Sequence, residues 1–212
     1  MIAAAPQIRH ELVLGRSEQG RPIIAWESGD PAAKRRILVV GCIHGDESAG
    51  SAIAAALVRA RVPTGVDLWV IPDLNPDGVA AGTRQNGRGV DLNRNFPYRW
   101  RPLNGVYSSG PRALSERESR IAYRLIRRIH PTVSIWFHQH LDVVDESGGD
   151  RRVELRFAAR VHMRAEQLTR YPGSATSWQN HTFPGTTSFV VELPAGPVPR
   201  PRLGDFTRAI LR

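Results

Sequence analysis

The stretch ILVVGCIHGDE, residues 37–47, is an apolar run that ends in a histidine and two carboxylates. A continuous run without alternating polar residues is typical of a strand that is buried on both faces. The alanine-rich stretch that follows, residues 47–61, predicts a helix that ends before Pro63. A buried strand that leads directly into a helix indicates an α/β fold.

The rest of the chain repeats this alternation and predicts one three-layer α/β/α domain over residues 1–212, with a mixed, mostly parallel sheet. Two stretches rich in Gly, Pro and polar residues, 72–110 and 171–185, are expected to be loops, and loops of this length in a compact domain are usually functional. A capping box of Ser115 and Glu118 is expected to open one of the helices. The expected elements are a hairpin at 11–14 and 22–26, strands at 66–71, 133–138 and 187–193, and helices at 115–130, 152–169 and 203–211.

Composition narrows the possible functions. The net charge of +9 comes from 29 basic residues, of which only Lys34 is a lysine, and the arginines are scattered along the chain. Scatter indicates a charged, solvated surface rather than a nucleic-acid site, which would gather the charge into a patch or a recognised motif. No segment approaches the roughly 18 consecutive apolar residues that a membrane span needs. The N-terminus shows no signal peptide, so we expect a cytoplasmic protein, or a secreted one if a leader has been trimmed.

His44 and Glu47 directly follow the buried strand, and their spacing of three predicts that both lie on one side of the first turn of the next helix. Imidazole nitrogen and carboxylate oxygen are common zinc ligands, and a catalytic zinc takes three protein ligands and a water. Taken alone, the pair is better explained without a metal, because Glu47 could complement the helix N-terminus and His44 could be a solvated turn residue. A zinc site therefore needs a third ligand.

A third ligand is available in the segment IWFHQH, residues 135–140, which ends a second apolar strand. His138 and His140 share a face if the strand continues that far. We expect His138 to be the ligand because it sits directly at the end of the apolar run. The other histidine would then be an ordinary polar residue at a strand end.

Glu192 lies within the apolar segment SFVVEL, residues 188–193. Burying a carboxylate in such a run is costly unless something compensates it. A water at a neighbouring zinc site would do so and would make Glu192 a general base and then an acid. A buried ion pair with an arginine is the structural alternative.

The long loop contains TRQN, residues 83–86, and GVDLNRNFP, residues 89–97. In the second segment Asn93 and Arg94 are adjacent, and together they offer an amide donor and a planar guanidinium fork that suit a carboxylate. A surface turn is the alternative, because Asn, Gly and Arg are common there.

Taken in order, these motifs resemble the zinc carboxypeptidases of the carboxypeptidase A type. The short length and the stretch YPGSATSW, residues 171–178, look most like the bacterial murein peptide amidases of that family, which release diaminopimelate from γ-D-glutamyl-diaminopimelate in cell-wall peptides. The resemblance covers roughly residues 15–193 and rests on five ordered motifs: His44-x-x-Glu47, NPDG at 75–78, DLNRNFP at 91–97, Phe137-His138 and Glu192.

The resemblance implies a role for each matching residue. One zinc per chain would be held by His44, Glu47 and His138, and Asp91 would orient the first histidine. Glu192 would be the catalytic carboxylate, and Arg84 would polarise the scissile carbonyl. The residues implied in substrate binding are Asn93 and Arg94 for the terminal carboxylate, Tyr171 as a tyrosine that covers the substrate, and Thr176 and Ser177, whose polarity argues against an aliphatic or aromatic pocket.

These roles predict a zinc metallocarboxypeptidase or amidase that acts on a cell-wall-derived peptide beside a free carboxylate. One alternative keeps the zinc and changes the substrate, as in N-acyl-amino-acid deacylases of the aspartoacylase or succinylglutamate desuccinylase type. A second alternative is a peptide-binding module without catalysis.

Overall fold

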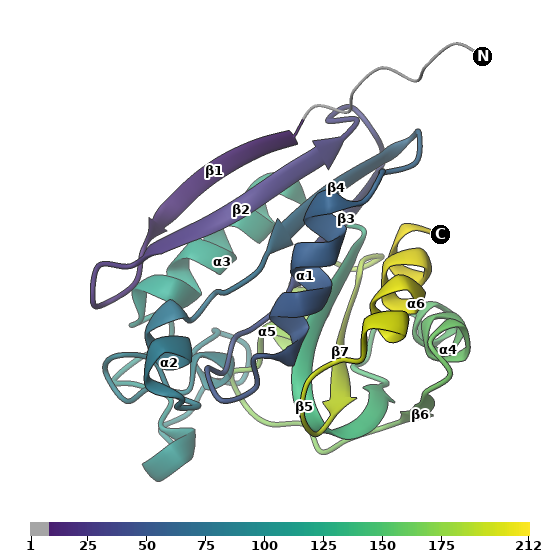
Figure 1. The fold of residues 1–212 in the computed structure, drawn as a ribbon. Coiled ribbons are helices and arrows are strands. Elements are labelled where there is room, and N and C mark those ends of the chain that lie inside the picture. The colour runs from purple at the N-terminus through teal and green to yellow at the C-terminus, as the bar shows by residue number, and fades with distance from the viewer. Residues whose placement is uncertain (1–8) are drawn as a thin grey trace, which may run out of the picture.

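The computed structural model describes residues 9–212, which form a seven-stranded mixed sheet with helices on both faces (Figure 1). Residues 1–6, on which the expectation of no signal peptide rests, lie outside the described part. The strand order is β1-β2-β4-β3-β5, and both β6 and β7 pair with β5. The strands are β1 (Arg9–Arg16), β2 (Pro22–Gly29), β3 (Arg35–Val40), β4 (Val66–Ile71), β5 (Val133–Asp145), β6 (Arg164–Glu166) and β7 (Thr187–Pro194).

Six α-helices and two short 3-10 helices are found in the described residues. The helices are α1 (Ala49–Arg59), α2 (Pro76–Ala81), α3 (Arg117–Ile129), α4 (Arg151–Arg160), α5 (Ala175–Thr182) and α6 (Arg200–Leu211), with 3-10 turns η1 (Leu92–Arg94) and η2 (Gly105–Tyr107). In Figure 1, α1 and α6 lie on the face of the sheet opposite to α3. On the face that α1 and α6 cover, one apolar core joins the sheet to α1, α4 and α6. On the other face, a second core joins the sheet to α3 and α5. The expected three-layer arrangement is confirmed.

The central strands explain why the sheet is mostly parallel. β3 pairs in parallel with β4 and β5, and β5 pairs in parallel with β6 and β7, whereas β1, β2 and β4 are joined by antiparallel pairing. Every residue of β4 and the last four of β3 are buried. Strands with helices on both faces need apolar side chains in both directions, as the continuous runs in the sequence predict.

Several of the expected elements differ in the structure. The capping box is wrong: α3 begins at Arg117 after Glu116, and the carboxylate of Glu118 instead accepts hydrogen bonds from Glu18 N and Asn86. The helix expected at 152–169 ends at Arg160, because the chain turns there and forms β6 alongside β5. A helix forms within each of the two stretches expected to be loops: α2 in the first, and α5 in the second, where it buries Trp178 in the second core.

Among residues 9–212, the helices are too short or too polar for any of them to cross a bilayer.

Candidate active site

The turn after β3 carries His44 and Glu47. β3 ends at Val40 and α1 begins only at Ala49, so the expectation that both side chains lie on the first helical turn is wrong. Instead a tight turn brings them together, in which Glu47 N donates to His44 O at 3.0 Å. The two side chains still lie together, with Nδ1 of His44 3.0 Å from Oε2 of Glu47.

This turn is packed against the start of α2. A Cβ atom on Gly45 would lie 1.8 Å from the carbonyl carbon of Gly78, so only glycine permits this approach. Asn75 caps α2 by accepting a hydrogen bond from Gly78 N at 2.9 Å. The NPDG motif therefore supports the turn that presents His44 and Glu47.

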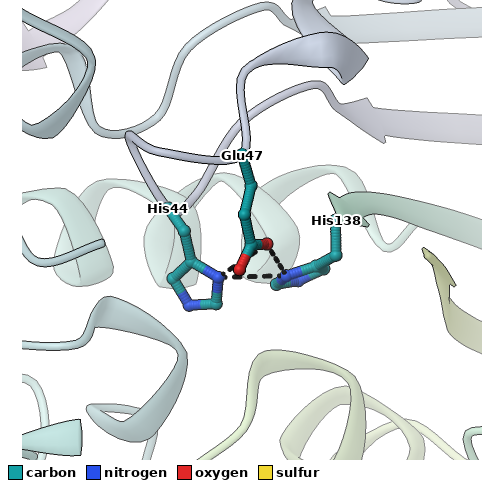
Figure 2. A group of neighbouring side chains, drawn as sticks. All are labelled: His44, Glu47 and His138. Carbon is teal, nitrogen blue, oxygen red and sulfur yellow. Dashed lines mark hydrogen bonds and ion pairs between the residues drawn. The ribbon is translucent and has the colours of Figure 1, made fainter. Parts of the chain in front are cut away.

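His138, in β5, completes a cluster with His44 and Glu47 (Figure 2). Oε2 of Glu47 lies 3.0 Å from Nδ1 of His44 and 2.8 Å from Nδ1 of His138, and the two Nδ1 atoms are 3.1 Å apart. Ligand atoms around a tetrahedral zinc at about 2.0–2.1 Å lie roughly 3.3 Å from one another. His140 is exposed and is not part of this cluster, so the choice of His138 over His140 agrees with the structure.

The hydrogen bonds of His44 show that the cluster suits a cation. Asp91 caps η1 and its Oδ1 lies 3.0 Å from Nε2 of His44. A neutral His44 that donates its Nε2 proton to Asp91 turns the lone pair of Nδ1 towards the Glu47 carboxylate. Two electron-pair donors that face each other in a buried place are stabilised by a cation between them, and the nitrogen, nitrogen and oxygen donor set is one that zinc prefers. The cluster fits a single zinc site.

Arg84 bridges the carboxylates of Asp91 and Glu47. Its Nε donates to Oδ2 of Asp91 at 2.9 Å, and its Nη1 donates to Oε1 of Glu47 at 2.8 Å. Burial by itself would raise the pKa of the Asp91 carboxyl, but His44 and Arg84 hold this pKa below its usual range. Arg84 is thus held beside the cluster and also lines the open cavity next to it.

Glu192 in β7 lies opposite His138 in the parallel pair with β5. Burial, together with the nearby Glu47 carboxylate, raises the pKa of Glu192 to about 7. Its Oε2 is buried without a hydrogen-bond partner among the described residues, and no ion pair to an arginine is formed there. A carboxylate with a pKa near neutrality can both accept and return a proton.

Asn93 and Arg94 are buried on η1 beside this cavity, in contrast to the surface-turn alternative. Oδ1 of Asn93 accepts from Ala175 N at 2.9 Å, which leaves its amide group to donate. Nη1 of Arg94 donates to the carbonyl of Asn93 at 2.9 Å, and its Nε has no partner within the described part of the chain. Both residues line the cavity, with donors suited to a carboxylate.

Two tyrosines sit over Arg94. The guanidinium carbon of Arg94 lies 4.3 Å from the ring centre of Tyr171 and 5.5 Å from that of Tyr107. The two rings are nearly parallel, with an angle of 14° between their planes. Tyr107 was not singled out by the sequence reasoning, because a tyrosine in a Gly-rich loop carries no spacing signal.

One cavity of about 650 Å³ is lined by the three residues of the cluster together with Arg84, Glu192, Asn93, Arg94 and the two tyrosines. Thr176 and Ser177, on the first turn of α5, line it as well, together with Tyr171. The structure adds further lining residues that sequence reasoning did not assign to the site, among them Tyr107, Gln139, Leu168 and Arg170. Of these, Arg170 could have been suspected from its place directly before Tyr171.

Comparison with known proteins agrees with this geometry. The family model for zinc carboxypeptidases matches residues 1–144. The chain therefore belongs to the zinc carboxypeptidase family, a family of hydrolases.

Within that family, the chain is similar to murein peptide amidase A of Escherichia coli strain K12, with 31% identity over 179 residues that cover 77% of this chain and 74% of the relative. The crystal structure of the murein-tripeptide amidase from Escherichia coli O157 superposes with a TM-score of 0.80 at 26% identity, covering 99% of this chain and 94% of that one. Carboxypeptidase A from Helicoverpa armigera shares the fold, with a TM-score of 0.80 at 17% identity over 96% of this chain and 67% of that one.

Proposed function

We propose that this chain is a zinc-dependent amidase that hydrolyses the bond between γ-D-glutamate and diaminopimelate in murein peptides. The observation that carries the proposal is that the cluster of His44, Glu47 and His138 opens onto the same cavity as Glu192 and Arg94. The similarity to murein peptide amidases supports the choice of substrate.

The positions of the side chains assign a separate chemical role to each group. Zinc held by the cluster would supply Lewis-acid chemistry, which polarises an amide carbonyl and makes a water more acidic. Glu192 would take a proton from the attacking water and deliver it to the leaving nitrogen. Arg84 would donate to the oxygen of the scissile carbonyl as negative charge develops on it.

Asn93 and Arg94 would bind the free carboxylate next to the scissile bond. A buried guanidinium with an unused N–H and an adjacent amide favour a substrate whose chain ends there. This arrangement supports an exopeptidase or amidase rather than an endopeptidase.

The test is hydrolysis of L-Ala-γ-D-Glu-diaminopimelate by zinc-loaded protein, with released diaminopimelate measured by mass spectrometry. We expect release with zinc and its loss after chelation, with recovery when zinc is restored. N-acyl amino acids and peptides that end in leucine or phenylalanine serve as competing substrates. A preference for N-acyl amino acids would contradict the proposal in favour of a deacylase, and a preference for leucine or phenylalanine would contradict only the murein substrate.

The proposed binding of the substrate carboxylate by Arg94 can be tested by substitution. Arg94→Ala should lower kcat/KM for the substrate with a free carboxylate far more than for the same substrate amidated at that position, because a hydrogen bond to a charged group contributes about 1.5–3 kcal/mol. The ratio of the two kcat/KM values, parent against variant, is the measurement. An equal loss on both substrates would show that Arg94 does not bind this carboxylate.

A further inference from the structure

The wall of the cavity carries a pair of opposite charges that the hydrolytic chemistry does not use. Asp145 is the last residue of β5, and Arg170 lies in the segment that leads to α5. Oδ2 of Asp145 is 3.3 Å from Nη1 of Arg170, and both residues line the same cavity as Glu192 and Arg94. The cavity therefore offers an acidic and a basic group side by side.

Hydrogen bonds with neighbouring residues hold this pair in place. Oδ1 of Asp145 accepts from Leu168 N at 2.9 Å, and its Oδ2 accepts from the hydroxyl of Ser147 at 2.7 Å. Arg170 donates from Nη2 to the carbonyl of Glu146. A guanidinium has five N–H donors, so these two bonds leave donors for a ligand. The positions of both charges are set before a ligand arrives, which lowers the cost of binding.

The neighbouring acidic residues have other partners. Glu146 makes an ion pair with Arg151, with Nε to Oε2 at 2.6 Å. Asp150 caps α4 by accepting from Arg152 N at 2.9 Å. Neither lines the cavity, so of these three carboxylates only that of Asp145 belongs to a residue that lines it.

The cavity has room for a long side chain at this wall. Arg170, Tyr171 and Ser177 also line a second hollow of about 520 Å³, so the two hollows adjoin here. Thr176 and Ser177 add hydroxyl groups to the lining of the first cavity. An apolar side chain that reached this wall would strip water from both charges without replacing their hydration.

We infer that Asp145 and Arg170 determine specificity by binding the far end of the released residue's side chain, where they select an ammonium and a carboxylate carried on one carbon. The inference rests on the proposed function, because it assigns the same substrate to the same cavity. The ammonium pairs with Asp145 and the carboxylate with Arg170, so that a zwitterionic end satisfies both. A side chain with only one of these groups leaves the other protein charge without a new partner.

A purely structural role for the pair is the alternative. The contacts of Asp145 with Ser147 and Leu168 also fasten the end of β5 to the segment before α5. A structural role predicts equal losses on every substrate, whereas a specificity role predicts losses that depend on the far end of the side chain.

The experiment uses four substrates that share L-Ala-γ-D-Glu and differ in the released residue. Diaminopimelate carries both groups at its far end, lysine only the ammonium, 2-aminopimelate only the carboxylate, and 2-aminoheptanoate neither. For the zinc-loaded parent we expect kcat/KM to be highest for diaminopimelate and lowest for 2-aminoheptanoate.

Each variant should remove one part of this preference. Asp145→Asn should reduce the preference for diaminopimelate over 2-aminopimelate by about 10- to 100-fold, and Arg170→Gln should reduce the preference for diaminopimelate over lysine by a similar factor. The kcat/KM for 2-aminoheptanoate should rise rather than fall in both variants, because each removes a charge whose hydration this apolar side chain cannot replace, and a retained activity also reports on correct folding. Glu146→Gln is the matched control, because this adjacent carboxylate pairs with Arg151 outside the cavity, and it should keep the parental preferences.

Two outcomes overturn the inference in different ways. Equal losses on all four substrates in Asp145→Asn and Arg170→Gln would assign the pair a structural role while the proposed function stands. No hydrolysis of any of the four by the zinc-loaded parent would remove the proposed function and this inference with it.

Discussion

At the scale of single residues, the site combines groups that are expensive to bury. Glu192 and Arg94 each leave a buried polar atom without a partner among the described residues, and both atoms belong to side chains that line the cavity. Unpaired buried polar groups cost free energy, so proteins keep few of them. At this cavity the unpaired atoms of Glu192 and Arg94 can gain partners when a substrate binds.

Glu192→Gln tests the central residue. Glutamine keeps the shape of the side chain but cannot accept a proton, and loss of a general base typically costs about 10²–10⁴ in rate. We expect a loss at the upper end of this range, with zinc content and melting temperature close to those of the parent. Near-normal kcat in a zinc-loaded variant would contradict the catalytic role, and a large fall in melting temperature with kcat retained would indicate a structural one.

At the scale of elements, loops that are stiffened by close backbone packing present the site. The turn between β3 and α1 rests on α2 through Gly45 and Gly78, and α5 begins where Asn93 accepts a hydrogen bond from its first residue. A displacement of either element would move ligands or substrate-binding groups together. Packing of this kind transmits a small change directly to the site.

Gly45→Ala tests the turn. The added Cβ would lie 2.2 Å from the carbonyl oxygen of Gly78, so the turn must shift and the cluster with it. We expect weaker zinc binding, measured by competition with a chelator, and a loss of stability of about 1–3 kcal/mol.

Gly204→Ala is the matched control for this substitution. In α6 the new Cβ would meet only the side chain of Arg208, at 3.1 Å. Replacing a glycine inside a helix by alanine should raise stability by about 0.5–1 kcal/mol and leave zinc affinity unchanged. Equal effects of the two variants would contradict the packing argument for Gly45.

The buried carboxyl of Glu154, in α4, makes the stability of the folded protein depend on pH. Burial raises the pKa of this carboxyl from 4.5 to about 7. A folded-state pKa above the unfolded one means that the folded protein binds more protons between these values, so stability falls as pH rises from about 4.5 to 7.

Glu154→Gln should therefore stabilise the protein at pH 8 by about 1–3 kcal/mol, because it removes the cost of a buried charge. The gain should shrink towards pH 5, where the folded parent already holds a proton on Glu154. Denaturant unfolding of parent and variant at both pH values measures this difference. A gain of the same size at both values would contradict ionisation as its cause.

At the scale of the whole molecule, the site joins parts of the chain that are far apart in the sequence. The zinc cluster links the turn after β3 to β5, at the centre of the sheet. Arg84, Arg94 and Tyr171 line the same cavity from the two long loops. A ligand that binds only the assembled site stabilises the fold by mass action.

Removal of zinc should lower the melting temperature. With free zinc at about 100 times its dissociation constant, the stabilisation is about 2.7 kcal/mol. We expect chelation to lower the melting temperature by several degrees in the parent and to have little effect in His138→Ala. An equal shift in both proteins would place the zinc elsewhere.

The sequence by itself determined the class of fold and the metal cluster. Buried strands of a mostly parallel sheet need continuous apolar runs, so β3, β4 and β7 could be located from residues 37–43, 66–71 and 187–193. The two motifs that hold His44, Glu47 and His138 stand directly after or within such strands, and their order along the chain, together with the resemblance to zinc carboxypeptidases, identified them as one cluster.

Only the tertiary structure decided the rest, because the remaining features depend on contacts between distant residues. α5 forms in a stretch whose composition predicts a loop, since burial of Trp178 in the second core outweighs weak local propensity. Glu47 precedes α1 because packing of Gly45 on Gly78 holds a turn there. Tyr107 meets Arg94, and Asp145 meets Arg170, only when the sheet brings their segments together. No periodicity in a single segment records a contact of that kind.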